Sequence, residues 1–115
     1  MTALLALALV QAETVTGVIR SSPGGSNFVG SFFIGDVQYN FLGKLRSRVP
    51  AFSSEKAQLT FDHVNQLREI QFFNVIVGHD NLDLEFYNGA SITGLLDNPL
   101  PEKSVAAGRV GIFQR

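Results

Sequence analysis

Residues 70–77 constrain the fold more than any other segment, because this short strand-like run is apolar on both of its faces. The large apolar side chains alternate along the run, with Ile70, Phe72 and Ile76 on one face and Phe73, Val75 and Val77 on the other. A strand of this kind has to be covered on both faces, by a second sheet, a helix or another chain. The run therefore predicts a layered or closed all-β domain with a surface for a partner.

Composition narrows the class of protein further. The chain has 115 residues, enough for one domain, and its hydrophobic fraction of 45% predicts a globular fold with a buried core. The net charge of -1 lacks the basic excess typical of proteins that bind nucleic acid, so we expect no nucleic-acid partner. The absence of cysteine excludes disulfides and cysteine nucleophiles. Ten Phe and no Trp suit a core or an apolar cavity better than a sugar site.

Residues 1–12 form an apolar N-terminal segment with two interpretations. Its end, Val10-Gln11-Ala12, resembles the cleavage site of a secretory signal, which would make the protein secreted. The segment is short and has no Lys or Arg near its start, and this favours a packed strand or helix of a cytoplasmic protein. It is also shorter than the roughly 20 residues that span a bilayer, so we expect no transmembrane span. Residues 13–115 are predicted to form a single all-β domain.

About eight strand-like segments follow one another at regular spacing, with turn signals between them. They are residues 13–20, 27–34, 37–41, 57–61, 67–77, 82–87, 90–96 and 105–113. Gly35-Asp36 and Asn88-Gly89 have the composition of tight hairpin turns, and residues 78–81 and 97–101 are predicted to end strands. Short antiparallel strands in this number predict a β-sandwich or a small closed β-barrel.

The phenylalanines divide between the two faces of these strands. Six are predicted to point inward: Phe28, Phe32, Phe41, Phe61, Phe72 and Phe86. Three fall on the opposite faces: Phe33, Phe73 and Phe113. An exposed apolar surface commonly marks a contact with a partner. We therefore assign Phe73, Val75 and Val77 to the interface of a homo-oligomer.

Each histidine has an aspartate beside it, but no catalytic arrangement is recognisable. His63 follows Asp62 and His79 precedes Asp80. A metal or acid–base site would require the two histidines to meet across adjacent strand ends. No serine lies in a nucleophile motif, so histidines in solvated turns are the favoured interpretation. His63 and His79 are retained as a first pair of candidate ligand-binding residues. We assign no catalytic residue, no metal site and no cofactor, and an enzyme is the less favoured class.

Acidic and tyrosine side chains supply a second group of candidate ligand-binding residues. Asp80, Asp83 and Glu85 lie close together, but without the spacing of a calcium-binding loop. Together with Tyr39 and Tyr87, they form a candidate site for a glycan. The alternation of this stretch with Leu82, Leu84 and Phe86 favours a simpler interpretation, a solvated polar face of a strand.

Three basic residues recur at every second position and so would share one strand face: Lys44, Arg46 and Arg48. Such a strip could receive phosphate, an anionic lipid headgroup or an acidic partner surface. Pairing with Asp83 and Glu85 on a neighbouring strand is the favoured interpretation. Aromatic residues are not interleaved with the basic ones, which argues against stacking platforms for nucleic-acid bases.

Three hypotheses for function follow. The preferred one is a non-enzymatic binding module that self-associates through an apolar sheet face. The first alternative is a β-barrel that holds a small apolar molecule, with isomerase- or cyclase-type activity at its mouth. The second alternative is a secreted carbohydrate-binding β-sandwich.

Overall fold

The computed structural model describes residues 11–115 as one all-β domain, so the predictions for residues 1–10 lie outside the described residues. The two hairpin turns predicted at Gly35-Asp36 and Asn88-Gly89 are present, each between two strands. The elements are β1 (Glu13–Ser21), β2 (Asn27–Ile34), β3 (Val37–Leu45), β4 (Ser53–Phe61), the short 3-10 helix η2 (Val64–Gln66), β5 (Glu69–Phe86) and β6 (Ser91–Gln114).

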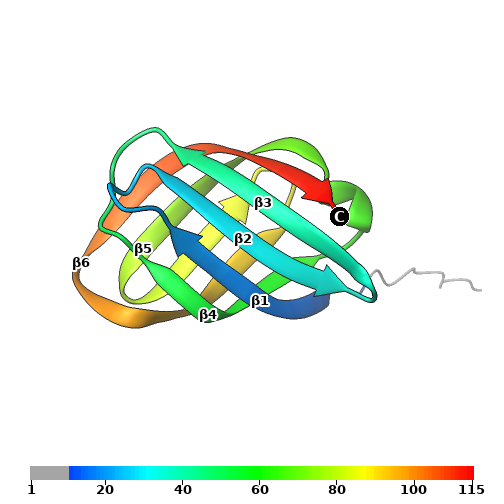
Figure 1. Ribbon diagram of the computed structural model, residues 1–115, viewed down its shortest axis with the longest axis horizontal. Coiled ribbons are helices and arrows are strands. Elements are labelled where there is room, and N and C mark those ends of the chain that lie inside the picture. The colour runs from blue at the N-terminus through cyan, green and yellow to red at the C-terminus, as the bar shows by residue number, and fades with distance from the viewer. Residues whose placement is uncertain (1–10) are drawn as a thin grey trace, which may run out of the picture.

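Five of the strands close into an antiparallel barrel. Their order is β3-β2-β1-β4-β6, and pairing between β3 and β6 closes the ring (Figure 1). The remaining strand, β5, pairs with β6 along most of its length. Of the two architectures that the sequence allowed, the molecule therefore adopts the closed barrel.

The described chain has six strands, so the prediction of about eight was wrong. We expected residues 78–81 and 97–101 to end strands, but β5 and β6 continue through them as one paired ladder. His79 pairs with Leu100 in the middle of this region, and the register shifts on either side of His79. Between the partners of Val77 and His79, β6 has three unpaired residues, and between those of His79 and Asn81 it has four. These extra residues bulge β6, so both strands bend here without ending.

The ladder reverses direction at this bend. Pairing is antiparallel from β4 through β1 and β2 to β3, so β4 and β3 run in opposite directions. Nevertheless β6 is antiparallel to both, pairing with β4 through residues 91–93 and with β3 through residues 108–114. It must therefore turn between these segments, as the orange stretch at the left of Figure 1 shows.

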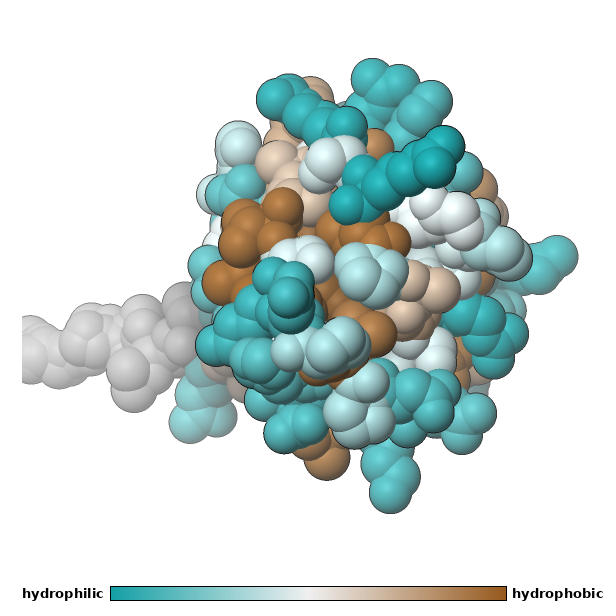
Figure 2. Space-filling view, turned by 90° about the vertical axis from the view of Figure 1, so that its left-hand side faces the viewer, coloured by the Kyte–Doolittle hydropathy of each residue, from teal (hydrophilic) through white to brown (hydrophobic). Residues whose placement is uncertain are grey.

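The turn divides the β5–β6 hairpin into two halves on different sides of the barrel. We call residues 69–77 and 104–114 the β3-side half, and residues 79–86 and 91–100 the β4-side half. Figure 2 views the molecule from the end where the hairpin bends, and there apolar surface lies among hydrophilic side chains.

Most of the predicted phenylalanine faces are confirmed. The buried ones are Phe28, Phe32, Phe41, Phe61 and Phe86, and the exposed ones include Phe33 and Phe113. The assignment within residues 70–77 was wrong, because Phe73 is 0% exposed and Phe72 is 47% exposed. Val75 and Val77 are also buried, so the three residues assigned to an interface belong to the core. Side chains alternate along a strand, so the direction of one side chain fixes the direction of all the others. Because both faces of this strand are apolar, the sequence does not show which face points inward.

Phenylalanine rings fill the interior of the barrel. The ring of Phe73 lies 5.5 Å from that of Phe28 and 6.5 Å from that of Phe86, measured between centroids. Phe86 in turn stacks on Phe41 at 6.2 Å, and Phe41 meets Phe32 edge to face at 5.5 Å. These ring contacts occupy the interior of the barrel, where an apolar ligand would otherwise lie.

Candidate functional site

The outer surface of the β3-side half carries a basic row that includes an aromatic ring. Lys44 of β3 pairs with Arg109 of β6, and Arg109 pairs with Phe72 of β5. All three residues are exposed. Two of the predicted basic residues, Lys44 and Arg46, thus meet a third cation and a phenyl ring from distant parts of the sequence.

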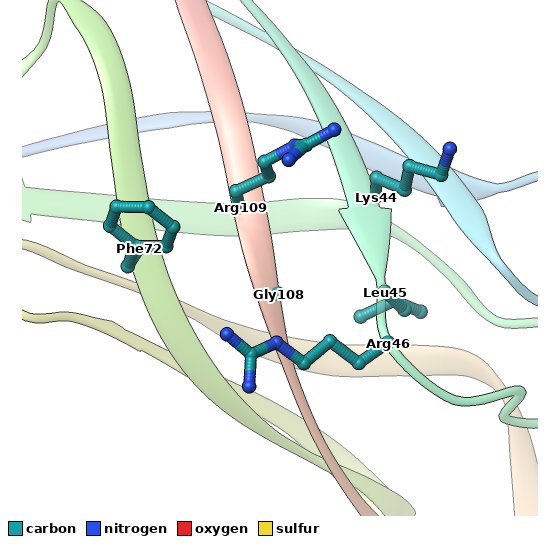
Figure 3. Close-up of a pocket in the computed structure, with 6 residues that line it drawn as sticks. All are labelled: Lys44, Leu45, Arg46, Phe72, Gly108 and Arg109. Atoms are coloured by element: carbon teal, nitrogen blue, oxygen red, sulfur yellow. The ribbon is translucent and has the colours of Figure 1, made fainter.

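These side chains line a hollow of about 320 Å³ on the barrel surface, which we call the basic hollow. Its lining is Lys44, Leu45, Arg46, Phe72, Gly108 and Arg109. Figure 3 shows the guanidinium of Arg46 reaching across β6 toward the ring of Phe72. Lys44 and Arg109 extend on the other side of the same opening. The hollow therefore presents three cations and no carboxylate.

Gly108 explains why β3 and β6 approach closely here. A Cβ atom at this position would collide with the backbone oxygen of Lys44 and would lie 2.9 Å from the ring of Phe73. Beyond the end of β3, the amide of Arg46 donates a hydrogen bond of 2.8 Å to the carbonyl of Ala107. This bond continues the pairing and holds Arg46 beside β6.

A second exposed ring extends the aromatic side of the basic hollow. Tyr87 is 71% exposed, and its ring centroid lies 6.3 Å from that of Phe72. Its amide donates a hydrogen bond of 2.9 Å to the carbonyl of Phe72. The following residue, Asn88, donates to the carbonyl of Gln66 at 3.0 Å, which fixes the turn. Sequence reasoning missed Phe72 and Arg109 as site residues, because no local pattern connects them.

The predicted pairing of the basic strip with Asp83 and Glu85 is not formed. The cross-strand neighbours of Lys44 are Asn27 and Arg109. Asp83 and Glu85 pair instead with Thr93 and Ser91 in the β4-side half of the hairpin. The reversal of the hairpin, which local alternation does not reveal, carries the acidic residues to a different side of the barrel. The third residue of the strip, Arg48, is exposed beyond the end of β3 and does not line the hollow.

The candidate glycan residues are not gathered into one site. Tyr39 is buried in the core, where its hydroxyl accepts a hydrogen bond of 3.3 Å from Gln114 Nε2. Tyr87 lies against Phe72 in the β3-side half, whereas Asp80, Asp83 and Glu85 are exposed around the bend and in the β4-side half. The two tyrosines therefore do not share a surface with the acidic stretch.

The histidines also lie apart. His63 precedes η2, in the connection from β4 to β5, and His79 lies in the bend, with the strand segment 69–77 between them. Within residues 11–115, no group of three or more His, Asp or Glu side chains is arranged to hold a metal ion. In the same part of the chain, no helix has the length and apolarity needed to cross a membrane.

A second surface lies next to the basic hollow on the same sheet. Ile70, Gly111, Leu42 and Val29 form one cross-strand row on β5, β6, β3 and β2. Phe113 lies two residues beyond Gly111 on β6. The four large side chains are each about half exposed, between 47 and 62%. A Cβ atom on Gly111 would meet no atom within 4 Å, so a dimple opens between these side chains. We call Val29, Leu42, Ile70, Gly111 and Phe113 the apolar sheet face.

Comparison with known proteins adds no relative to this description: no family model matches the sequence, and neither a curated protein nor a solved structure is significantly similar to the chain.

Proposed function

We propose that the protein is a non-enzymatic binding module that self-associates through the apolar sheet face. The observation that supports this proposal is the row from Ile70 to Val29, which leaves large apolar side chains in water on adjacent strands. Contiguous exposed apolar surface commonly marks a contact with a partner. The proposed interface is therefore the apolar sheet face, in place of Phe73, Val75 and Val77, which are buried in the core.

A second copy of the chain fits this surface. The apolar sheet face contains no charged residue, so apposing two copies brings no like charges together at its centre. A two-fold contact would place the same row on both sides, and the dimple at Gly111 would receive an apolar side chain of the partner. Sheets commonly pack face to face in this way, with interleaved side chains.

The two alternatives have less support. A ligand-holding barrel requires interior space, and the rings of Phe28, Phe73, Phe86 and Phe41 contact one another across the interior. A carbohydrate site built on Tyr39 requires that side chain at the surface, where it is not found.

Gly111→Glu tests self-association without disturbing the core. The position has open space and no positive φ, so the barrel can accept a side chain there. We expect the parent to sediment as a dimer at micromolar concentration. Burial of an unpaired carboxylate in the contact should weaken the dimer by at least about 2 kcal/mol, roughly 30-fold in its dissociation constant.

Gly111→Ala is the matched control, because it adds a Cβ atom to the same position without a charge. It should remain a dimer. Sedimentation of the parent as a monomer would contradict the proposal, and so would a Gly111→Glu variant that dimerises as tightly as the parent.

A further inference from the structure

The basic hollow contains a charge arrangement that folding alone does not explain. Lys44 and Arg109 are direct cross-strand partners, and Arg46 comes from the same strand end. Like charges directly opposite one another in a sheet are destabilising. None of the six lining residues is acidic. An anion bound in the hollow would remove this repulsion.

The aromatic side of the hollow has an equally specific arrangement. Phe72 is the cross-strand partner of Arg109, and Tyr87 lies against Phe72 with both rings substantially exposed. Surfaces that bind single-stranded nucleic acid combine cations with exposed aromatic rings. The cations contact the phosphates, and the rings stack on the bases. In the sequence the two kinds of residue are separate, and pairing of β3, β6 and β5 brings them together.

We propose that the basic hollow binds a nucleotide unit. The phosphate contacts Lys44, Arg46 and Arg109, and the base stacks on the platform formed by Phe72 and Tyr87. Guanidinium groups suit this role because they donate paired hydrogen bonds to phosphate oxygens. A free nucleotide and a nucleotide within a single strand share this chemistry. The site lies one cross-strand row from the apolar sheet face on the same strands, and binding of a nucleotide there does not require self-association.

The net charge of -1 does not oppose this inference, because none of the acidic residues lines the hollow. Several of the acidic residues, including Asp83, Glu85 and Asp97, lie in the β4-side half of the hairpin. Asp97 is occupied there, accepting hydrogen bonds from the Ser53 hydroxyl at 2.8 Å and the Glu55 amide at 3.1 Å. An approaching phosphate responds to the local field of the hollow, which is positive.

The first experiment measures fluorescence anisotropy of a labelled single-stranded oligothymidylate titrated with the full chain at low salt. We expect saturable binding that weakens as salt is added, because bound counterions are released. Unlabelled thymidine monophosphate then identifies the source of the nucleotide. If a low concentration of thymidine monophosphate displaces the labelled oligonucleotide, the ligand is a free nucleotide. If the oligonucleotide stays bound in its presence, the ligand is a single strand. Absence of oligonucleotide binding together with absence of direct thymidine monophosphate binding would overturn the proposal.

Three variants test the residues. Tyr87→Ala removes an exposed ring and should weaken oligonucleotide binding roughly tenfold. Arg109→Gln should weaken oligonucleotide binding. It should also lower, by about one, the slope of the logarithm of the binding constant against the logarithm of the salt concentration. Lys56→Gln is the matched control, because it makes the same loss of charge on β4, beside Asp83, and should bind as the parent does. The proposal fails if Lys56→Gln weakens binding as much as Arg109→Gln, or if Tyr87→Ala binds as tightly as the parent.

None of the three variants changes a residue of the apolar sheet face, so each should still dimerise, and this includes Arg109→Gln, whose position lies one cross-strand row away on the same strands. Sedimentation of each variant alongside the binding titration therefore separates the two proposals. A chain that dimerises and does not bind nucleotide would leave the proposed function in place and remove only this inference.

Discussion

The two halves of the β5–β6 hairpin present similar side chains to the core and different ones to the solvent. Inside, Phe73 and Val75 of the β3-side half correspond to Leu84 and Phe86 of the β4-side half, and all four are buried. Outside, the β4-side half carries polar residues such as Asp83, Glu85 and Thr93. The outer surface of the β3-side half carries Ile70, Phe72, Arg109 and Phe113 instead.

This difference separates residues that stabilise the barrel from residues available for binding. Burial accounts for the inner faces of both halves, because apolar side chains there are removed from water. Burial in the core does not account for the row of apolar and cationic side chains that the outer face of the β3-side half presents to solvent. The outer face of the β3-side half is therefore where substitutions should alter binding and leave the fold intact.

Phe73→Ala should have the largest effect on stability. The ring is fully buried and contacts Phe28 and Phe86, so its removal should lower the free energy of unfolding by about 3–5 kcal/mol. Leu84→Ala makes the equivalent change in the β4-side half and should cost about 2–5 kcal/mol. Urea denaturation measures both. If Phe73→Ala cost less than Phe72→Ala, the inner and outer faces would be assigned wrongly.

Gly78→Ala tests the bend that separates the two halves. Gly78 has a φ of 112°, and a Cβ atom there would collide with the backbone oxygen of Glu102. We expect a loss of about 1–3 kcal/mol or more in thermal or urea denaturation.

Gly35→Ala is the control for this variant. Gly35 also has a positive φ, of 61°, but a Cβ atom there would meet nothing within 4 Å. It should therefore lose less stability than Gly78→Ala. Equal losses would mean that the contact with Glu102, and thus the tight bend, contributes nothing.

Phe72→Ala should have the smallest effect on stability, about 0.5 kcal/mol, because nearly half of the side chain is already exposed to water. The same variant should weaken oligonucleotide binding in the anisotropy titration, since Phe72 supports Tyr87. A large loss of stability together with unchanged binding would reverse the interpretation of this outer face.

Local pattern predicted much of the barrel. The alternation around Phe41, Phe61 and Phe86 placed these side chains inside, and the composition of Gly35-Asp36 and Asn88-Gly89 placed two turns. Pattern failed at residues 78–81 and 97–101, where polar and turn-forming residues suggested strand ends. A bend made by two paired strands together has the same local composition as two separate turns, so only the partner strand distinguishes them.

The sequence by itself determined the all-β class, the tight turns and the inward faces of strands with one apolar side. These properties depend on neighbours in the chain, through backbone preferences and the two-residue period of a strand. The tertiary structure alone decided the closed barrel, the burial of Phe73 and the exposure of Phe72. It alone also gathered Lys44, Arg46 and Arg109 beside two aromatic rings. All of these depend on the register between strands that are distant in the sequence. A shift of the register by one residue would exchange the buried and exposed faces of a strand.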